Sequence, residues 1–293
     1  MEDLKDFLLQ QYQKRLPYLK KEGIEAYRLT GNSGRHPFAI DIYGNSAVIH
    51  IFAESALREV KLIEEGLNRL LGIKDFFYKN RTRLDLKLPP SSHREIIVNE
   101  HGNKFLINLS DYQDVGLFLD HREARKWIGS ISKGKTVLNT FAYSGSFSIY
   151  AANAGAFKTY SVDLSRAYCD WIKKNIELNS LPAEKNWVYK MDTMEFFHYA
   201  AKKGLKFDII VIDPPTFSKN KKENFSVQKD HPKLLNAALE LLNRGGLIFF
   251  SNNFTQFILK KELLLPSVIQ RRDFIPFDFE GQFPHKGFII RKK

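Results

Sequence analysis

The feature that most constrains the fold is an alternation of short apolar segments with amphipathic helical patterns, which runs from about residue 136 to residue 252. The apolar segments are TVLNTF (136–141), FKTYSVDL (157–164), WVYKMD (187–192), FDIIVID (207–213) and GLIFFSN (246–252). Nearly continuous apolar strands separated by helices are typical of a parallel sheet covered on both faces. The sequence therefore predicts a doubly wound α/β domain over residues 113–293.

The residues before this domain follow a different pattern. The predicted elements are a helix over 1–24 with an apolar face at Leu4, Phe7, Leu8 and Tyr12, a hairpin turning at 43–46, a helix over 56–73 that ends at Gly72, a strand that starts at 75, and a hairpin turning at 101–103. Helices with one apolar stripe and hairpins with short polar turns indicate a small domain with its own core. We expect an N-terminal helix over 1–24 and a small α+β domain over 25–112.

Charge points to the class of partner. Lys and Arg total 45 against 33 Asp and Glu, which gives a net charge of +12. Such an excess favours association with a polyanion, most simply nucleic acid, although a solvated lysine-rich surface is the plainer alternative. The chain lacks an apolar run of roughly 20 residues, and its amphipathic, acidic start is unlike a signal peptide, so we expect a cytoplasmic location. A single cysteine, Cys169, excludes an internal disulfide and a cysteine-rich zinc site.

The carboxyl ends of the predicted strands carry the informative residues, because ligands of open parallel sheets bind there. After the first strand the turn NTFAYSGS contains one glycine, Gly145, whereas a dinucleotide site needs three. The second strand ends at Asp163, about 20 residues later, where an acidic side chain accepts the hydroxyls of a ribose. The third ends at Asp192 and the fourth at Asp213. This pattern predicts a nucleoside ligand without a diphosphate.

Other chemistries fit these strand ends less well. Aspartate also caps helices, but three aspartates in register with a short glycine turn favour a site. We expect no metal, because the sequence shows no close pair of histidines and each strand end offers one carboxylate. The G-x-S-x-G pattern of serine hydrolases is absent. A cofactor with a ribose and no diphosphate is S-adenosylmethionine (SAM), which is therefore the predicted cofactor.

Four ordered blocks of the sequence resemble a known family. They are residues 109–156, SVDLSRAYCDWIKKNIELN, FDIIVIDPPTFSKNKKENFSVQKDH and GGLIFFSNN. They are similar to the class I SAM-dependent methyltransferases that act on 23S ribosomal RNA, and most of all to the N7-guanine methyltransferase domain of bifunctional large-subunit enzymes. The similarity extends over about residues 25–293. It implies a Rossmann-like class I methyltransferase sheet with helices on both faces, preceded by the small α+β domain.

The resemblance also implies roles for particular residues. The turn at 143–145 would hold the methionine end of SAM, Asp163 the ribose and Asp192 the adenine amino group, while Asp120 and Arg122 would lie over the amino acid moiety. The implied cofactor residues are Asp120, Arg122, Asn139, Phe141, Tyr143, Ser144, Gly145, Asp163, Leu164, Asp192 and Asp213. In the bifunctional relatives a further half precedes this region, where the present chain has the helix of 1–24.

The segment DPPTF would form the catalytic part of the site, with Asp213, Pro214, Pro215 and Phe217 as its residues. The usual motif is Asp-Pro-Pro-aromatic, and here Thr216 displaces the aromatic residue by one position. Thr216, Lys219, Asn252 and Asn253 are the predicted substrate-binding residues. The segment 217–231 carries four lysines and is expected to meet phosphates.

The residue types near the DPPTF motif indicate which atom of the base is methylated. Guanine N7 presents a lone pair and needs no general base, which agrees with the absence of a neighbouring histidine or cysteine in the sequence. Methylation of cytosine C5 needs a nucleophilic cysteine. Related cytosine enzymes place it where this chain has Asn252 and Asn253, and Cys169 is expected to be buried and structural. A cytosine target is therefore disfavoured.

The resulting hypothesis is a SAM-dependent methyltransferase that modifies an RNA base, with guanine N7 of 23S ribosomal RNA, or of a large-subunit precursor, as the target. Three alternatives stay open. The chain can instead methylate an exocyclic amine of RNA, act on a small molecule or a protein, or bind RNA without catalysis as an assembly factor. We expect neither a membrane nor a metal among its partners.

Overall fold

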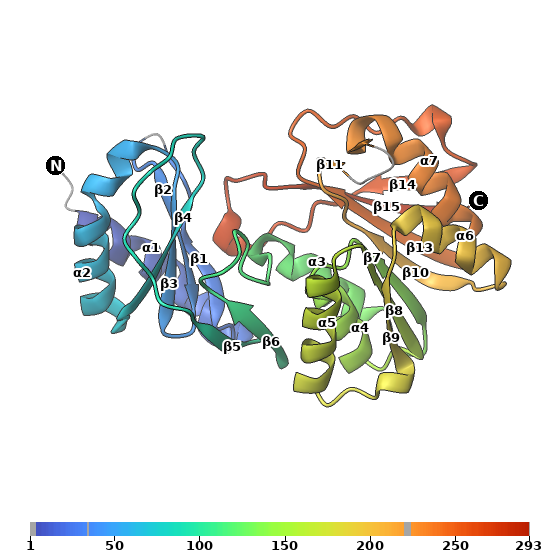
Figure 1. Cartoon of the computed structure of the whole chain (residues 1–293), viewed down its shortest axis with the longest axis horizontal. Helices are drawn as coiled ribbons and strands as arrows, with labels where there is room; N and C mark the ends of the chain where they lie inside the picture. The colour runs from blue at the N-terminus through green and yellow to red at the C-terminus, as the bar shows by residue number, and fades with distance from the viewer. Residues whose placement is uncertain (1–3, 34, 220–223, 293) are drawn as a thin grey trace. The chain divides into compact units, whose positions relative to one another are not determined.

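The computed structural model describes residues 4–33, 35–219 and 224–292. The chain divides into two compact units (Figure 1). Unit 1 comprises Met1–Leu119 and Pro276–Gln282, and unit 2 comprises Asp120–Ile275 and Phe283–Lys293. The boundary predicted at residue 112 lies within unit 1, and the short segment 276–282 returns to unit 1 from the C-terminal part of the chain. The three predicted domain ranges remain a prediction.

Unit 1 is a small α+β unit. Its elements are α1 (Leu4–Glu22), β1 (Ala26–Thr30), β2 (Phe38–Tyr43), β3 (Ser46–Ile51), η1 (Glu54–Arg58), α2 (Val60–Leu71), β4 (Asp75–Asn80), β5 (Glu95–Glu100), β6 (Asn103–Asn108) and η5 (Phe277–Phe279). One sheet has the order β1-β2-β3-β4, in which β4 runs parallel to β3 after the crossover through α2. The predicted hairpins are confirmed, since Tyr43 pairs with Ser46 and Glu100 with Asn103.

The helix α2 shows why the sequence folds in this way. Its buried stripe includes Ile63 and Leu67, which pack in one cluster with Leu8 of α1. Burying each such side chain contributes about 1.5–3 kcal/mol. Gly72 ends the helix with a left-handed φ of 69°, and its N–H donates to Asn68. Glycine adopts this conformation without a steric penalty, so the predicted helix end is confirmed.

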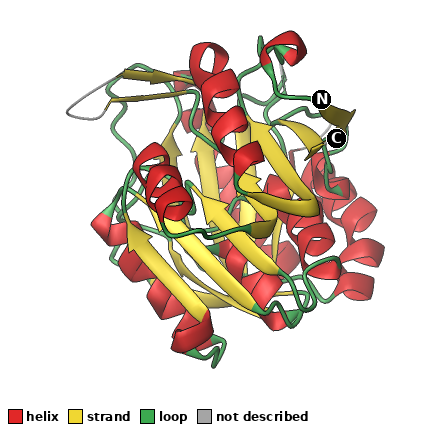
Figure 2. Cartoon of the chain, turned by 90° about the vertical axis from the view of Figure 1, so that its right-hand side faces the viewer, coloured by secondary structure: helices red, strands yellow, loops and turns green. Residues whose placement is uncertain are grey.

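Unit 2 contains a seven-stranded sheet flanked by helices (Figure 2). Its strands are β7 (Thr136–Thr140), β8 (Lys158–Asp163), β9 (Asn186–Lys190), β10 (Phe207–Ile212), β13 (Leu242–Asn252), β14 (Ser267–Arg271) and β15 (Lys286–Lys292). Its helices are η2 (Leu119–His121), α3 (Arg122–Ser130), α4 (Ser146–Asn153), α5 (Arg166–Leu178), η3 (Ala183–Lys185), α6 (Thr193–Lys202), α7 (Val227–Glu240) and η4 (Lys261–Leu263). The first residue of η2, Leu119, belongs to unit 1. The strand order is β14-β15-β13-β10-β7-β8-β9.

Both faces of this sheet are covered, as the continuous apolar strands predict. Alternate residues of one strand point to opposite faces. Val137 packs with Phe147 of α4 in one core cluster, whereas its neighbour Leu138 packs with Phe196 of α6 in another. The predicted α/β fold with helices on both faces is confirmed.

Two features of the sheet position the site. The strand order reverses between β7 and β10, and the carboxyl ends of parallel strands at such a reversal form the ligand-binding crevice of doubly wound folds. The sheet is not wholly parallel, because β15 runs antiparallel to β13 and pairs Lys286 with Asn252. The residues just before β15 therefore arrive beside the carboxyl end of β13. Among the helices of the described residues, none is long and apolar enough to cross a membrane.

Candidate functional site

The turn after β7 has an unusual backbone. Phe141 and Tyr143 have positive φ values of 53° and 51°, and Gly145 follows with 79°. Left-handed conformations at non-glycine residues cost roughly 1–3 kcal/mol each and cluster at functional sites. A Cβ at Gly145 would lie 2.9 Å from Cγ2 of Ile172, so the turn packs closely on α5. Close packing and strained backbone together hold the amides of this turn in one arrangement.

Asp163, at the end of β8, is tied to the same turn. Its Oδ2 accepts from the Tyr143 backbone N–H at 2.9 Å, and its Oδ1 from that of Ser165 at 2.9 Å. Burial raises the pKa of this carboxyl, and the backbone hydrogen bonds oppose that rise. Each carboxylate oxygen has a second lone pair, so Asp163 can also accept both hydroxyls of a ribose. The next residue, Leu164, exposes 53% of its surface and offers an apolar contact beside that carboxylate.

Three other predicted cofactor residues have internal partners. The amide Nδ2 of Asn139, a buried residue, donates to Ser148 Oγ at 3.1 Å. The carbonyl of Ser144 accepts from Asn175 Nδ2 at 2.9 Å. Asp192 is the N-cap of α6, where its Oδ1 accepts from the backbone N–H of Met194 at 2.8 Å. These contacts fix the loops that surround the reversal point, and a direct role in cofactor binding stays a prediction for all three.

The segment that follows β10 presents Asp213 at the edge of the sheet. Its side chain is 26% exposed. Oδ1 accepts from Ser251 Oγ at 2.7 Å, and Oδ2 lies 3.3 Å from His121 Nε2. Pro214 is buried and Pro215 is exposed. The carboxylate is therefore anchored from the side of the sheet while part of it remains open.

Phe217 lies outside the core, with 67% of its surface exposed. Its ring centroid is 6.2 Å from that of Phe254, with an angle of 62° between the planes. Thr216, the inserted residue, donates from Oγ1 to Asn253 Oδ1 at 2.6 Å. This bond links the motif to the end of β13. An exposed aromatic ring is suited to stack on a planar base.

The end of β13 holds the two predicted asparagines. Asn253 is exposed, whereas Asn252 is 1% exposed. Asn252 Oδ1 accepts from the Phe254 backbone N–H at 3.1 Å, but Nδ2 has no hydrogen-bond partner among the described residues. Both asparagines line a cavity of about 190 Å³ together with Phe283. A buried donor without a partner beside a cavity is suited to bind a ligand acceptor.

Parts of the predicted basic segment lie outside the described residues. These are residues 220–223 and the side chains of Lys219 and Asn224. In the described part of the segment, β11 (Phe217–Lys219) pairs antiparallel with β12 (Asn224–Ser226), and α7 begins at Val227. The predicted contact of this segment with phosphates stays a prediction.

Two histidines beside the motif were missed. The expectation that no histidine stands next to Asp213, and that the chain has no close pair of histidines, is wrong. The rings of His121 and His285 are stacked, with centroids 4.0 Å apart and planes within 15°. They are far apart in the sequence, and β15 brings His285 to the end of β13. The one available signal is that His121 directly follows Asp120, itself a predicted site residue.

The residues around the histidine pair complete the site. Asp120 Oδ2 lies 3.1 Å from His285 Nδ1, and the Asp273 carbonyl lies 2.6 Å from His285 Nε2. Arg122 opens α3 with its surface fully buried, so it is not the surface arginine that its position at the start of a helix allows. Cys169 is buried, as expected of a structural thiol.

A family model, that of S-adenosylmethionine-dependent methyltransferases, matches residues 86–267. The chain belongs to this family. It is 34% identical to ribosomal RNA large subunit methyltransferase K of Neisseria meningitidis serogroup B, over 95% of this chain and 84% of that protein. It is 37% identical to ribosomal RNA large subunit methyltransferase K/L of Psychrobacter cryohalolentis, over 100% of this chain but 41% of that protein. The resemblance predicted from the sequence is confirmed.

Solved structures agree with the family. A methyltransferase complexed with SAH is 28% identical to this chain, with a TM-score of 0.82 over 98% of this chain and 81% of the other. The predicted cofactor, SAM, is therefore confirmed at the level of the family. In this chain the strained turn at 141–145 and the Asp163 carboxylate fit the nucleoside and amino acid parts of that cofactor, because they offer backbone amides and two acceptor oxygens side by side.

Proposed function

We propose that this methyltransferase modifies a base of large-subunit ribosomal RNA, with guanine N7 as the target atom. The observation that carries the proposal is that the segment after β10 holds both a partly open carboxylate, Asp213, and an exposed aromatic ring, Phe217. The name of the Neisseria relative, which this chain covers to 84%, supports ribosomal RNA as the substrate. A net charge of +12 supports binding to a polyanion.

The residues of the motif suit a displacement that depends on alignment. When bound, SAM supplies a methyl group on a sulfonium, which N7 takes with its lone pair while the carbon–sulfur bond breaks toward sulfur. Phe217 stacks on the base and holds it in place. Pro214 and Pro215 each fix a φ near −65° and so limit the motion of the motif. The Asp213 carboxylate offsets the positive charge that arrives on the base, as preorganised charges do in transition states.

The histidine beside Asp213 bears on the choice of target atom. Methylation of an exocyclic amine releases a proton and needs an acceptor for it, whereas N7 methylation does not. His121 is 5% exposed, its Nε2 lies toward Asp213, and its Nδ1 is buried. A ring enclosed in this way is not placed to take a proton from a base. An exocyclic amine is the second candidate, since Asp213 itself can accept from it.

The test is a methyl-transfer assay with purified protein and 23S ribosomal RNA from a strain that lacks the enzyme. We expect nucleoside mass spectrometry to find 7-methylguanosine with the wild type, and a loss of at least about 100-fold with Asp213→Asn. Asp170→Asn, at an aspartate on α5 whose side chain is 48% exposed, is the matched control and should keep full activity. An N2- or N6-methylated product would favour the amine, and SAM binding without methylation of any ribosomal RNA would refute an RNA substrate.

We also propose that unit 1 contacts the RNA strand and that the enzyme works in the cytoplasm. The support is the overall positive charge and the nature of the substrate. Crosslinking of the whole chain to 23S ribosomal RNA, followed by mass spectrometry of the peptides, tests the first point. Crosslinks confined to residues 120–275 would contradict it.

A further inference from the structure

One polar cluster of unit 2 is left without a role by the proposed function. It consists of Asp120, His121 and His285, and it touches Asp213 through His121. We call His121 and His285 the histidine pair. Both are buried, with 5% and 2% of their surfaces exposed. Buried titratable groups in contact with a catalytic carboxylate are candidates for a part in the reaction.

The contacts of His285 determine its protonation state. Nδ1 lies 3.1 Å from Asp120 Oδ2, and Nε2 lies 2.6 Å from the carbonyl oxygen of Asp273. Neither a carboxylate nor a carbonyl can donate a hydrogen bond, so both ring nitrogens must carry hydrogen. His285 is therefore an imidazolium. Burial lowers its pKa, but the hydrogen bond and charge of Asp120, with the charge of Asp213, outweigh burial and raise it.

The contacts of His121 give the opposite state. Its ring lies flat on the His285 cation. Its pKa is lowered to about 4, first by burial and then by the charge of His285, with a smaller effect of Arg125, and Asp213 and Asp120 oppose this fall. A neutral imidazole has one N–H. Because Nε2 faces the Asp213 carboxylate at 3.3 Å, that nitrogen carries the hydrogen, and Nδ1 has no partner among the residues described.

A cation site is a poorer account of the cluster. Ligand-type atoms of Asp120, His121 and His285 do lie within 4.8 Å of one another. A metal ligand must be a neutral imidazole with a lone pair directed at the ion. His285 has both nitrogens directed at oxygen acceptors, so it would have to lose a proton and one of two hydrogen bonds. The geometry of His285 therefore favours hydrogen bonds to Asp120 and Asp273 over coordination of a metal.

We propose that His121 is a positioning residue for methyl transfer, which donates through Nε2 to Asp213 and so fixes the orientation of that carboxylate. The inference rests on the proposed function in taking Asp213 as the group that faces the base. Ser251 holds the other oxygen at 2.7 Å, so the two donors together stop the carboxylate from rotating. His285 keeps His121 in the neutral form that donates at Nε2.

This arrangement also preserves the charge of Asp213. The cation of His285 is balanced by Asp120. Burial raises the pKa of the nearby Asp273 carboxyl, but the hydrogen bonds from Arg271 and Gly287 and, least, the charge of His285 lower it. A charged His121 would instead form an ion pair with Asp213. The ion pair would weaken the electrostatic attraction between that carboxylate and the positively charged methylated base. With a neutral donor, Asp213 is oriented without being neutralised. The four side chains, which are those of Asp120, His285, His121 and Asp213, therefore fix the orientation of the Asp213 carboxylate. They leave its negative charge available to the substrate.

The first test separates positioning from stability. We expect His121→Leu to lower kcat for methylation of 23S ribosomal RNA by about 10- to 100-fold, while the Kd of SAM changes less than about twofold. His121→Gln keeps an N–H near the position of Nε2 and should recover most of that loss. His198 is an exposed histidine on α6 of the same unit and is the control. We expect His198→Gln to keep kcat. If His121→Leu is as active as the wild type, or if His121→Gln is no better than His121→Leu, the proposal is wrong.

The second test needs no RNA, so it stands even if ribosomal RNA is not the substrate. ¹⁵N NMR of the histidine rings should show His121 neutral with hydrogen on Nε2 between pH 5 and pH 8, and His285 doubly protonated at pH 6. In His285→Gln the neighbouring cation is gone, and the pKa of His121 should rise. A charged His121 at pH 6, or hydrogen on its Nδ1, would overturn the inference. A normal NMR result with no methylation of RNA would instead refute the proposed function alone.

Discussion

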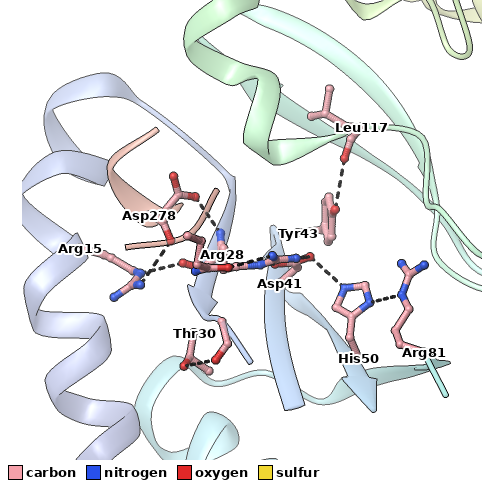
Figure 3. Close-up of polar contacts among 11 residues, drawn as sticks. Arg15, Arg28, Thr30, Asp41, Tyr43, His50, Arg81, Leu117 and Asp278 are labelled. Atoms are coloured by element: carbon pink, nitrogen blue, oxygen red, sulfur yellow. Dashed lines mark hydrogen bonds and ion pairs between the residues drawn. The ribbon is translucent and has the colours of Figure 1, made fainter. Parts of the chain in front are cut away.

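Two buried polar networks, one in each unit, have similar members but differ in how completely they are paired. In unit 1, Asp41 accepts from Arg28 Nε at 2.7 Å and Nη2 at 2.9 Å, and from His50 Nε2 at 2.9 Å (Figure 3). Arg81 then donates to His50 Nδ1 at 3.1 Å. Both oxygens of Asp41 and both nitrogens of His50 have partners.

In unit 2 the corresponding chain through the histidine pair is incomplete. Nδ1 of His121 and Nδ2 of Asn252 lack partners in the part of the chain that the structure describes, and Asp213 is partly open to solvent. A fully paired network rigidifies a core, whereas one that leaves buried polar atoms unpaired gives up stability unless a ligand supplies the partners. We infer that the network of unit 1 serves stability and that of unit 2 serves the reaction. The predictions below test this contrast.

The largest expected effect is that of Asp41→Ala on stability. The change removes the shared acceptor of Arg28, whose side chain is 19% exposed, and of the buried His50, which costs about 3–5 kcal/mol of the free energy of unfolding. Urea denaturation measures it. Asp170→Ala on the surface should change that free energy by less than about 0.5 kcal/mol. A loss below about 1 kcal/mol in Asp41→Ala would contradict a stabilising role for this network.

Asp213→Asn should lower activity strongly and stability little, which is the reverse of what we expect for Asp41→Ala. We expect kcat to fall at least about 100-fold, equivalent to about 2.7 kcal/mol of transition-state stabilisation. The free energy of unfolding should change by less than about 1 kcal/mol, because the side chain is partly exposed and the amide keeps an acceptor for Ser251. Steady-state kinetics and urea denaturation on the same preparation measure both quantities. A variant that unfolds as readily as Asp41→Ala would erase the distinction between the two networks.

The predictability of the two networks differs for a physical reason. The strand ends at Asp163, Asp192 and Asp213 can be read from the sequence because each follows a local apolar run, and the parallel sheet brings such ends together. The partners His285 and Ser251 cannot be read in this way. His285 depends on β15 being antiparallel to β13, and Ser251 depends on β13 lying beside β10, and both are long-range pairings that local patterns do not specify.

The fold shows the same limit. The hairpin at Tyr43 to Ser46 and the helix ending at Gly72 are set by local turn chemistry, and both are confirmed. The return of Pro276–Gln282 to unit 1 is not visible locally, yet it supplies Asp278, whose Oδ2 accepts from the Arg28 N–H at 2.8 Å. Asp192 shows a different limit of the sequence. An aspartate at the start of a helix can cap that helix or bind a ligand, so its position alone does not tell the two roles apart.

A smaller effect is expected for the cofactor carboxylate. Asp163→Asn keeps two acceptor lone pairs on its amide oxygen but replaces the other carboxylate oxygen by a donor, which would face the N–H of Tyr143 or Ser165. We expect SAM affinity to fall about 20-fold, equivalent to about 1.8 kcal/mol. Calorimetry with SAM measures this change. Asp208→Asn, whose carboxylate binds the Thr136 N–H at the amino end of β7, is the control that should leave SAM affinity unaltered. Equal losses in the two variants would point to a general loosening of the sheet.

The smallest predicted effect is the part of the pH dependence of stability that comes from His121 in unit 2. The folded-state pKa of His121 is about 4, below the usual 6.5, so the unfolded chain binds more protons between these values. The stability associated with a neutral His121 is therefore complete above pH 6.5 and is lost as the pH falls toward 4. Between pH 7 and pH 5.5 the wild type should lose about 1 kcal/mol more than His121→Gln, in which this group does not titrate. Both proteins retain His285, whose raised pKa has the opposite sign and largely cancels in the difference. Urea denaturation at the two pH values checks the result, and identical losses would show that folding does not lower the pKa of His121.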